Sequence, residues 1–244
     1  MAMDYEAMTD EELLELAQHY FNGTDDFEQD PEEGAYIVKI AADRGNADAL
    51  CEYGTCLLNG TGVPKDDKAA LQYWEQSAEK GCALATYKIA VCHLNGLCGL
   101  EKDPSKGAVL LDKAAQLGDA DAMFRLALLY ENGVGVPKDS GKADEYVRSA
   151  AKQDHPIACF FLGMKIMSGA GEDREKIAQA VQLIGFAAES GEAQAQFVYG
   201  SLFQNGQGVE KDLAQAAGWY RRSAKAGFPP ANQALMQLGF PGVQ

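Results

Sequence analysis

Apolar residues recur along the chain in a pattern that repeats every 36 or 37 residues. The segment LAQHYFNG, which ends at Gly23, returns in five related copies, each with apolar residues at helical spacing and a small polar residue and glycine at its end. A second motif, first seen as AADRG ending at Gly45, follows each copy at the same interval. Two motifs that share one period indicate a tandem array of six structural units.

Each unit is predicted to contain two helices. In the second unit the first helix carries Ala49, Tyr53, Gly54 and Leu57, whose spacing places them on one helical face. The helix is expected to end at Asn-Gly, because glycine readily adopts the left-handed conformation that follows many helices. One position of this helix is always small, which suits close approach of a second helix; we call it position 0, and it holds Ala17, Gly54, Ala90, Ala127, Gly163 and Gly200.

The second helix of each unit is expected to begin at a recurring aspartate, whose carboxylate can accept hydrogen bonds from the free amides of the first turn. The fifth unit has Lys176 at this position, so its cap must differ. No segment shows the strict alternation of a β-strand, and the fold class is predicted to be all-α. The capping aspartates are Asp30, Asp66, Asp103, Asp139 and Asp212.

The double motif resembles a known family. The pattern A-x-x-x-L-G-x-x-Y-x-x-G-x-G-V, followed by A-x-x-W-Y-x-x-A-A-x-x-G, is clearest at residues 122–136 and 216–227. It is similar to the Sel-one-like repeat (SLR) family, which is related to the tetratricopeptide repeat. The resemblance implies a right-handed α-α superhelical solenoid of about six helix pairs, with roles in assembling protein complexes. Asp154, in place of a turn glycine, is a local departure from the pattern.

The repeats divide the chain into consecutive segments. Residues 1–8 are expected to form an N-terminal tail, and residues 228–244 a C-terminal capping helix and tail, because the last unit of a solenoid needs its apolar face covered. The six repeats are placed at residues 9–45, 46–81, 82–118, 119–154, 155–191 and 192–227.

Charge and hydropathy narrow the classes of partner. The net charge is −15, from 21 basic and 36 acidic residues, which disfavours nucleic acid and anionic lipid and favours partners with basic groups. No apolar run is long enough to span a membrane. The first residues lack the features of a secretory signal, so a cytoplasmic location is expected; a secreted effector without a recognisable signal peptide is the alternative.

Several motifs suggest chemistry that the repeat itself explains. Ser77 and Ser149 each begin an S-x-x-K motif as in serine β-lactamases, but the companion motifs of those enzymes are missing. The family resemblance leaves open a penicillin-binding or β-lactamase-like hydrolase of the cysteine-rich SLR type, although the cysteines here do not recur once per repeat as in that branch. We expect no enzyme activity and no cofactor.

Metal binding is also considered at Cys92, His93 and Cys98. Cys92 and His93 are adjacent on a helix and point about 100° apart, so they are poorly placed to share an ion. His93 occupies the same repeat position as Leu57 and Tyr130, and a packed histidine is favoured over a ligand. We therefore expect no metal site, and free thiols at all six cysteines because a chain of this length folds without disulfides.

The predicted function is a protein–protein interaction scaffold or adaptor that binds a peptide or protein in the concave groove. By analogy with tetratricopeptide arrays, positions −3, +1 and +4 of the first helices line that groove, and exposed apolar area marks interaction sites. The alternative is that the −3 aromatic residues only stack between repeats. Acidic residues nearby favour a partner that combines basic and apolar groups. The candidate contacts are Tyr87, Val91, Leu94, Phe124, Leu128, Phe160, Met164, Met167 and Phe197.

Overall fold

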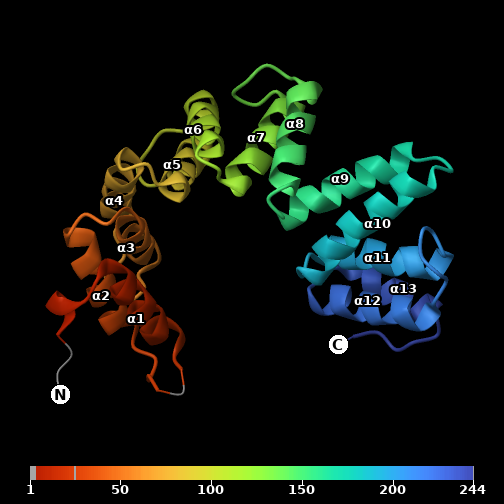
Figure 1. Ribbon diagram of the computed structural model, residues 1–244, viewed down its shortest axis with the longest axis horizontal. Helices are drawn as coiled ribbons and strands as arrows, with labels where there is room; N and C mark the ends of the chain where they lie inside the picture. The colour runs from red at the N-terminus through yellow and green to blue at the C-terminus, as the bar shows by residue number, and fades with distance from the viewer. Residues whose placement is uncertain (1–3, 25, 244) are drawn as a thin grey trace. The chain divides into compact units, whose positions relative to one another are not determined.

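The structure, a computed structural model, describes residues 4–24 and 26–243. Within these residues the chain is built from α-helices with one short 3-10 helix, η1 (Tyr5–Ala7), and the only β-type pairing is an isolated bridge between Thr24 and Phe27 (Figure 1). The prediction of an all-α fold is confirmed.

Helices alternate between the two types that the repeat predicts. The first helices are α1 (Asp10–Asn22), α3 (Ala47–Asn59), α5 (Ala83–Asn95), α7 (Ala120–Asn132), α9 (Pro156–Gly169) and α11 (Ala193–Asn205). The second helices are α2 (Pro31–Asp43), α4 (Asp67–Glu79), α6 (Pro104–Gln116), α8 (Ser140–Ala151), α10 (Arg174–Glu189) and α12 (Leu213–Lys225), and a final helix α13 (Pro229–Gln237) follows them.

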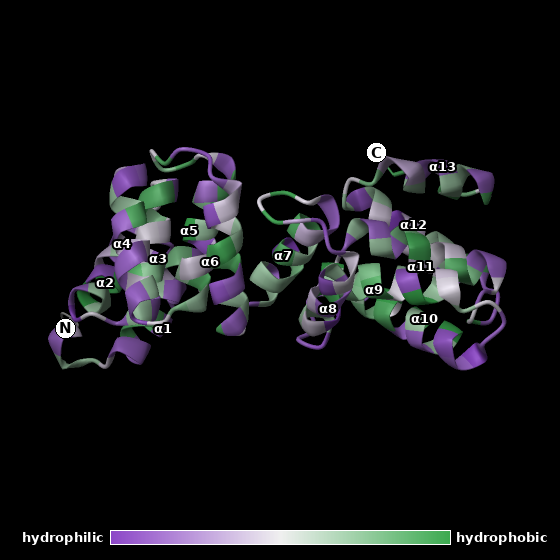
Figure 2. Ribbon diagram, turned by 90° about the horizontal axis from the view of Figure 1, so that it is seen from above, coloured by the Kyte–Doolittle hydropathy of each residue, from purple (hydrophilic) through white to green (hydrophobic). Residues whose placement is uncertain are grey.

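The chain divides into two compact units, residues 1–140 and 141–244. In the first unit α1, α3, α5 and α7 lie along the inner side of the curve that the unit follows, and α2, α4 and α6 lie along its outer side (Figure 1). Figure 2 shows that the helices carry both hydrophobic and hydrophilic residues, as expected for helices that are packed on one side and solvated on the other.

Position 0 is the point where the two helices of a repeat meet. A Cβ atom built on Gly54 would lie 2.7 Å from Cδ1 and Nε1 of Trp74, and one built on Gly200 would lie 2.9 Å from the ring of Tyr220. Both aromatic residues belong to the second helix of the same repeat. The prediction that small residues permit close helix approach is therefore confirmed.

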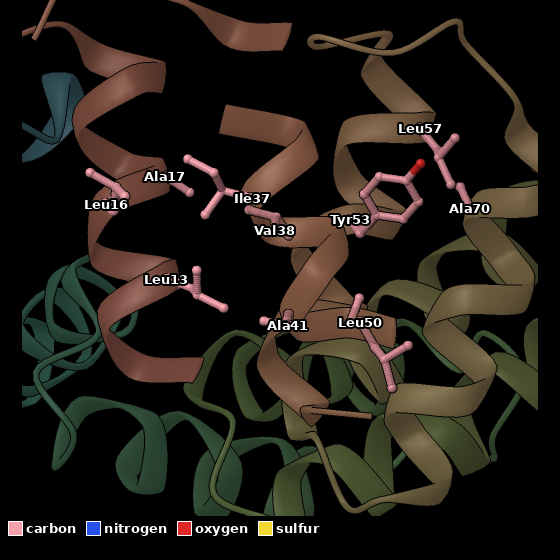
Figure 3. Close-up of a cluster of buried hydrophobic side chains, with 12 residues drawn as sticks. Leu13, Leu16, Ala17, Ile37, Val38, Ala41, Leu50, Tyr53, Leu57 and Ala70 are labelled. Atoms are coloured by element: carbon pink, nitrogen blue, oxygen red, sulfur yellow. The ribbon is translucent and has the colours of Figure 1, made fainter. Parts of the chain in front are cut away.

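The hydrophobic core runs from one repeat into the next. The first cluster joins Leu13 of α1, Ile37 and Val38 of α2, and Leu50 and Tyr53 of α3 (Figure 3). Because residues of three successive helices share one cluster, the second repeat completes the core of the first, as in other solenoids.

Aspartates cap the second helices at most of the predicted positions. Asp66, for example, accepts hydrogen bonds from the amides of Lys68 and Ala69, and Asp30, Asp103 and Asp212 act in the same way. In the fifth repeat Asp173 accepts from the amides of Glu175 and Lys176. Lys176 is thus not at the cap but inside the first turn, and α10 is longer, with 16 residues.

Both ends of the array are covered by short segments. At the N-terminal end the Tyr5 hydroxyl donates to Glu33 of α2 over 2.6 Å, and the Arg44 guanidinium donates to the carbonyl of Met8. At the other end α13 packs on α12 through Ala231 and Leu235, so the predicted capping helix is present.

Candidate peptide-binding surface

Two positions of each first helix point away from its partner helix. At about 100° per residue, positions −2 and +1 lie roughly 160° and 100° from the packed position 0. In the first unit these positions are exposed or half-buried, and we call the surface they form the inner face. Its residues are Glu15, Glu52, Lys88 and Arg125 at −2, and Gln18, Thr55, Val91 and Leu128 at +1.

The aromatic residues at position −3 do not form the exposed stripe that the sequence suggested. Phe124 and Phe160 are only 7% and 5% exposed, and Phe160 belongs to a core cluster with Val181 and Ile184 of α10. Phe197 is half-buried, with its ring centroid 5.3 Å from that of Tyr220. Position −3 lies only about 60° from position 0, so the rings of Phe160 and Phe197 reach the second helices of their own repeats.

The other predicted contact residues are more accessible. Leu128 and Met164, both at position +1, are 38% and 39% exposed, and Val91 is half-buried. At position +4, Leu94 and Met167 are half-buried. The Leu94 side chain covers Gly107 of α6, where a Cβ atom would lie 2.7 Å from Leu94 Cγ. Leu94 therefore packs against α6 and also contributes to the accessible surface.

An apolar cavity of about 210 Å³ opens at the junction of the second and third repeats. Tyr87 and Val91 of the predicted site form one wall, and the indole of Trp74 is held in place by a 3.0 Å hydrogen bond from Nε1 to the carbonyl of Cys51. Lys88 Nζ lies 5.6 Å from the centroid of the Trp74 ring. The complete lining is Leu58, Trp74, Tyr87, Lys88, Val91, Cys92, Leu97 and Cys98, which suits a branched or aromatic side chain.

A second cavity, of about 160 Å³, lies one repeat earlier, between α1 and α3. Its charged group is Glu52, which accepts a hydrogen bond from the Gln18 side chain. Burial raises the pKa of Glu52 above its usual range, against the opposing effect of the Gln18 hydrogen bond. A half-buried carboxylate of this kind is stabilised by a positively charged guest. Phe21, Thr55, Cys56, Asn59 and Thr61 complete the lining.

The charge at position −2 changes sign along the first unit. Glu15 and Glu52 stand on α1 and α3, whereas Lys88 and Arg125 stand on α5 and α7. The Arg125 Nε–H donates to the Tyr87 hydroxyl over 2.6 Å, which fixes the guanidinium beside the apolar cavity. The inner face therefore offers an acidic region, an apolar cavity and a basic region in that order.

The second unit has its own exposed apolar residues on a first helix. Ile157, Phe161 and Met164 are spaced along one side of α9 and are 38%, 48% and 39% exposed. Three side chains at this helical spacing form a continuous apolar strip, which is a common feature of contact surfaces.

The groups singled out for chemistry have structural roles. Ser77 is fully buried, and its hydroxyl donates to the carbonyl of Ala47 over 2.6 Å. The Ser149 hydroxyl donates to the carbonyl of Glu145 over 2.9 Å. His93 is buried in the core, as predicted, and burial lowers the pKa of its imidazole. The hydroxyls of both S-x-x-K serines thus bind backbone carbonyls.

Across residues 4–24 and 26–243, no three His, Cys, Asp or Glu side chains gather as a metal site would require. In that part of the chain no helix is both long and apolar enough to cross a membrane.

Comparison with known protein families shows a repeat over most of the chain. The family model of the Sel1 repeat matches six successive segments: residues 13–46, 47–82, 83–119, 120–155, 156–192 and 193–228.

Curated relatives carry names of regulators and binding proteins. "Chitin synthase regulatory factor 3" of Schizosaccharomyces pombe is 27% identical over 96% of this chain and 30% of its own length. "Chitin synthase regulator SKT5" of Malassezia restricta is 31% identical over 74% of this chain and 13% of its own length. "DAP3-binding cell death enhancer 1" of Rattus norvegicus is 30% identical over 71% of this chain and 34% of its own length. The chain spans about a third or less of each of these proteins.

Solved structures support the same assignment. A Sel1 repeat protein from Oxalobacter formigenes is 28% identical and superposes with a TM-score of 0.81 over 96% of this chain and 67% of that one. A protective antigen of uropathogenic Escherichia coli, described as having an SLR fold, is 26% identical with a TM-score of 0.67 over 94% of this chain and 49% of its own. Since the repeat matches run without a break from residue 13 to residue 228, this chain belongs to the Sel1 repeat family.

Proposed function

We propose that this chain is a protein-interaction scaffold whose inner face binds an extended peptide segment carrying a basic and an apolar side chain. The observation that supports this most directly is the presence of two cavities on successive repeats of one face, one with a carboxylate and one with apolar walls. Relatives named as chitin synthase regulators and as a DAP3-binding protein are of the same functional class.

The spacing of the cavities sets the spacing of the ligand's anchors. Packed helices lie ~8–10 Å apart, and an extended peptide advances ~3.3 Å per residue. A ligand would therefore place its basic residue at Glu52 about three residues away from the apolar residue that enters the cavity beside Val91. Entry of a guanidinium or ammonium would offset the cost of the half-buried Glu52 carboxylate.

The change of charge along the inner face predicts the orientation of the bound peptide. Lys88, in the wall of the apolar cavity, and Arg125, one repeat further along, favour an acidic group on the ligand at that end. Complementary charges at both ends of a binding site discriminate between the two orientations of a peptide and exclude partners with the wrong order. We therefore expect the sequence basic, apolar, acidic along the bound segment.

The remaining predicted contacts assist this site or act in the second unit. Leu94 and Leu128 extend the apolar surface of the first unit, and Phe124 supports it from the core. In the second unit Met164 and Met167 are the accessible candidates, Phe160 lies in the core cluster that Met167 packs against, and Phe197 is half-buried against Tyr220.

The test starts with capture of partners by the full chain, followed by a peptide scan of the captured proteins and affinity measurements on the best peptide. Val91→Asp puts a charge into the apolar cavity and should weaken binding at least ~10-fold, since losing a buried apolar anchor costs more than ~1.4 kcal/mol. The matched control is Val109→Asp on α6, because Val109 is 70% exposed and the same charge there stays in water.

Reversal of the Glu52 charge tests whether this carboxylate binds the basic residue of the peptide. Glu52→Lys should weaken a peptide with arginine at the basic position and favour a peptide with glutamate there, whereas Glu79→Lys on the outer helix α4 should change neither. Circular dichroism confirms that each variant keeps its helical content. Binding that survives Val91→Asp but is lost with Val109→Asp would place the site on the outer helices and refute the proposal.

A further inference from the structure

Four of the six cysteines gather in one core cluster around Trp74: Cys51, Cys82, Cys92 and Cys98. Within it the sulfur atoms of Cys92 and Cys98 are only 3.3 Å apart. Both side chains are nearly buried, with 3% and 6% exposure, yet both line the apolar cavity of the inner face. Small molecules that enter the cavity can therefore reach this pair of thiols.

The backbone around the pair favours a bond between the two sulfurs. A disulfide has an S–S distance of about 2.05 Å, so the sulfurs must approach by roughly 1.3 Å. Cys92 is fixed in α5, but Cys98 lies in the loop after it, between Gly96 and Gly99. Those glycines have φ values of +71° and +79°, and Cys98 itself has φ +55°, a left-handed conformation that non-glycine residues adopt at some cost. A small adjustment of this loop is enough to bring the sulfurs together.

We propose that Cys92 and Cys98 are an oxidisable dithiol that a hydroperoxide converts into a disulfide within the third repeat, thereby narrowing the apolar cavity. In the first step the Cys98 thiol loses its proton and its sulfur attacks the O–O bond; Cys98 becomes a sulfenic acid, and the departing oxygen takes up a proton and leaves as water or an alcohol. In the second step the Cys92 sulfur attacks the Cys98 sulfur, its proton leaves with the displaced hydroxide as water, and the S–S bond forms. Two thiols are oxidised and one hydroperoxide is reduced.

The environment assigns the two sulfurs to different steps. Burial, together with the hydrogen bond that the Cys92 thiol donates to the Cys98 sulfur, raises the pKa of Cys92 to about 12, so Cys92 remains a thiol at neutral pH. A hydroperoxide is attacked by a thiolate, and the loop residue Cys98 is the one that meets it; in the second step the hydroxide displaced from Cys98 takes the Cys92 proton, so Cys92 does not have to ionise beforehand. Cys92 then resolves the sulfenic acid from a position already in contact with it.

The expected consequence for binding rests on the proposed function. Leu97, which precedes Cys98, is 49% exposed and forms part of the cavity wall. Drawing the Cys98 sulfur toward α5 moves this wall inward, so an apolar side chain fits less well. Reduction by a dithiol reverses the change, since thiol–disulfide exchange restores both thiols.

The chemical step is tested on the reduced full chain. Hydrogen peroxide is added, free thiols are alkylated, and the protein is digested without reductant. We expect a peptide that joins Cys92 to Cys98 with the loss of two hydrogens, while Cys159, a buried thiol outside the cluster, stays free. Cys92→Ser should leave a Cys98 sulfenic acid that a dimedone probe traps. Recovery of all six free thiols, or a link between Cys51 and Cys82 instead, would overturn the proposal.

The effect on the cavity is measured in two ways. Amide hydrogen exchange of residues 96–101 should slow on oxidation of the parent and not of Cys98→Ser, and unchanged exchange would refute the loop movement. The peptide identified in the peptide scan should bind the oxidised protein about 10-fold more weakly, and its affinity should recover on reduction. Equal affinity of the oxidised and reduced forms would refute the narrowing of the apolar cavity. If no peptide binds the inner face while the link and the slowed exchange are both observed, the proposed function fails and the dithiol stands.

Discussion

Gly54→Ala is a direct test of the helix contact that builds each repeat. The added methyl group would lie 2.7 Å from Cδ1 and Nε1 of Trp74 and 3.0 Å from the carbonyl oxygen of Ala70. Neither neighbour can move freely: Trp74 is 2% exposed and donates a hydrogen bond to the carbonyl of Cys51, and the Ala70 oxygen belongs to helix α4. The two helices of the second repeat must therefore separate or the indole must turn.

Three contributions decide the magnitude. Alanine stabilises a helix interior by up to ~1 kcal/mol relative to glycine. Overpacking of a dense core costs ~1–3 kcal/mol, and loss of the Trp74–Cys51 hydrogen bond costs about 1 kcal/mol more. The net expectation is a destabilisation of roughly 1–3 kcal/mol, or ~2–4 °C in Tm per kcal/mol for a chain of this size.

The matched control is Gly218→Ala in α12, where a Cβ atom meets nothing within 4 Å. The same substitution there should stabilise by ~0.5–1 kcal/mol, because only the helix propensity changes. Urea denaturation and thermal melting followed by circular dichroism measure both variants. If Gly54→Ala is as stable as Gly218→Ala, the close contact at position 0 does not limit the packing and the reasoning is wrong.

Further predictions concern single polar groups. Because burial raises the pKa of Glu52, the folded state holds the carboxyl proton more tightly than the unfolded state, and stability falls as the pH rises through this pKa. Glu52→Gln should therefore stabilise the protein at neutral pH and reduce the change of Tm with pH in thermal melts. A lower Tm of the variant at neutral pH would contradict this prediction. Asp173→Ala should lower the urea midpoint, whereas Lys176→Ala leaves it nearly unchanged; equal effects would reject Asp173 as the cap. Tyr220→Phe should cost about 1 kcal/mol in urea unfolding, since its hydroxyl donates to Gln204 over 2.5 Å, and an unchanged midpoint would show that the bond is not stabilising.

The first helices show which features follow from neighbouring residues in the sequence. Gly60, Gly96, Gly133 and Gly206 all adopt the left-handed conformation after an asparagine, as the Asn-Gly motif predicts. Most second helices begin at the predicted aspartates. A cap of this kind also depends only on nearby residues, namely a side chain and the amides two or three residues later. The family assignment also needed only the sequence, since it rests on motifs repeated at a fixed period.

The exception in the fifth repeat shows where local information was insufficient. Asp173 and Lys176 are three residues apart, and counting from the repeat places the helix start at the lysine. The helix begins directly after the aspartate because the Asp173 carboxylate accepts hydrogen bonds from two amides of the first turn. This earlier start lengthens α10 by almost one turn. A search for capping side chains near the expected position would have found it.

The binding surface depended on the tertiary structure. Sequence period places Phe124 and Phe160 on the side of the helix next to position 0, but only the approach of the second helix decides whether such rings are buried, and here they are. The apolar cavity and the contact between Cys92 and Cys98 were likewise absent from the sequence pattern, since no other repeat carries a cysteine in the loop that follows its first helix. Periodicity fixes which way each side chain points from its own helix; how close the neighbouring helix and loop come determines what remains open to a partner.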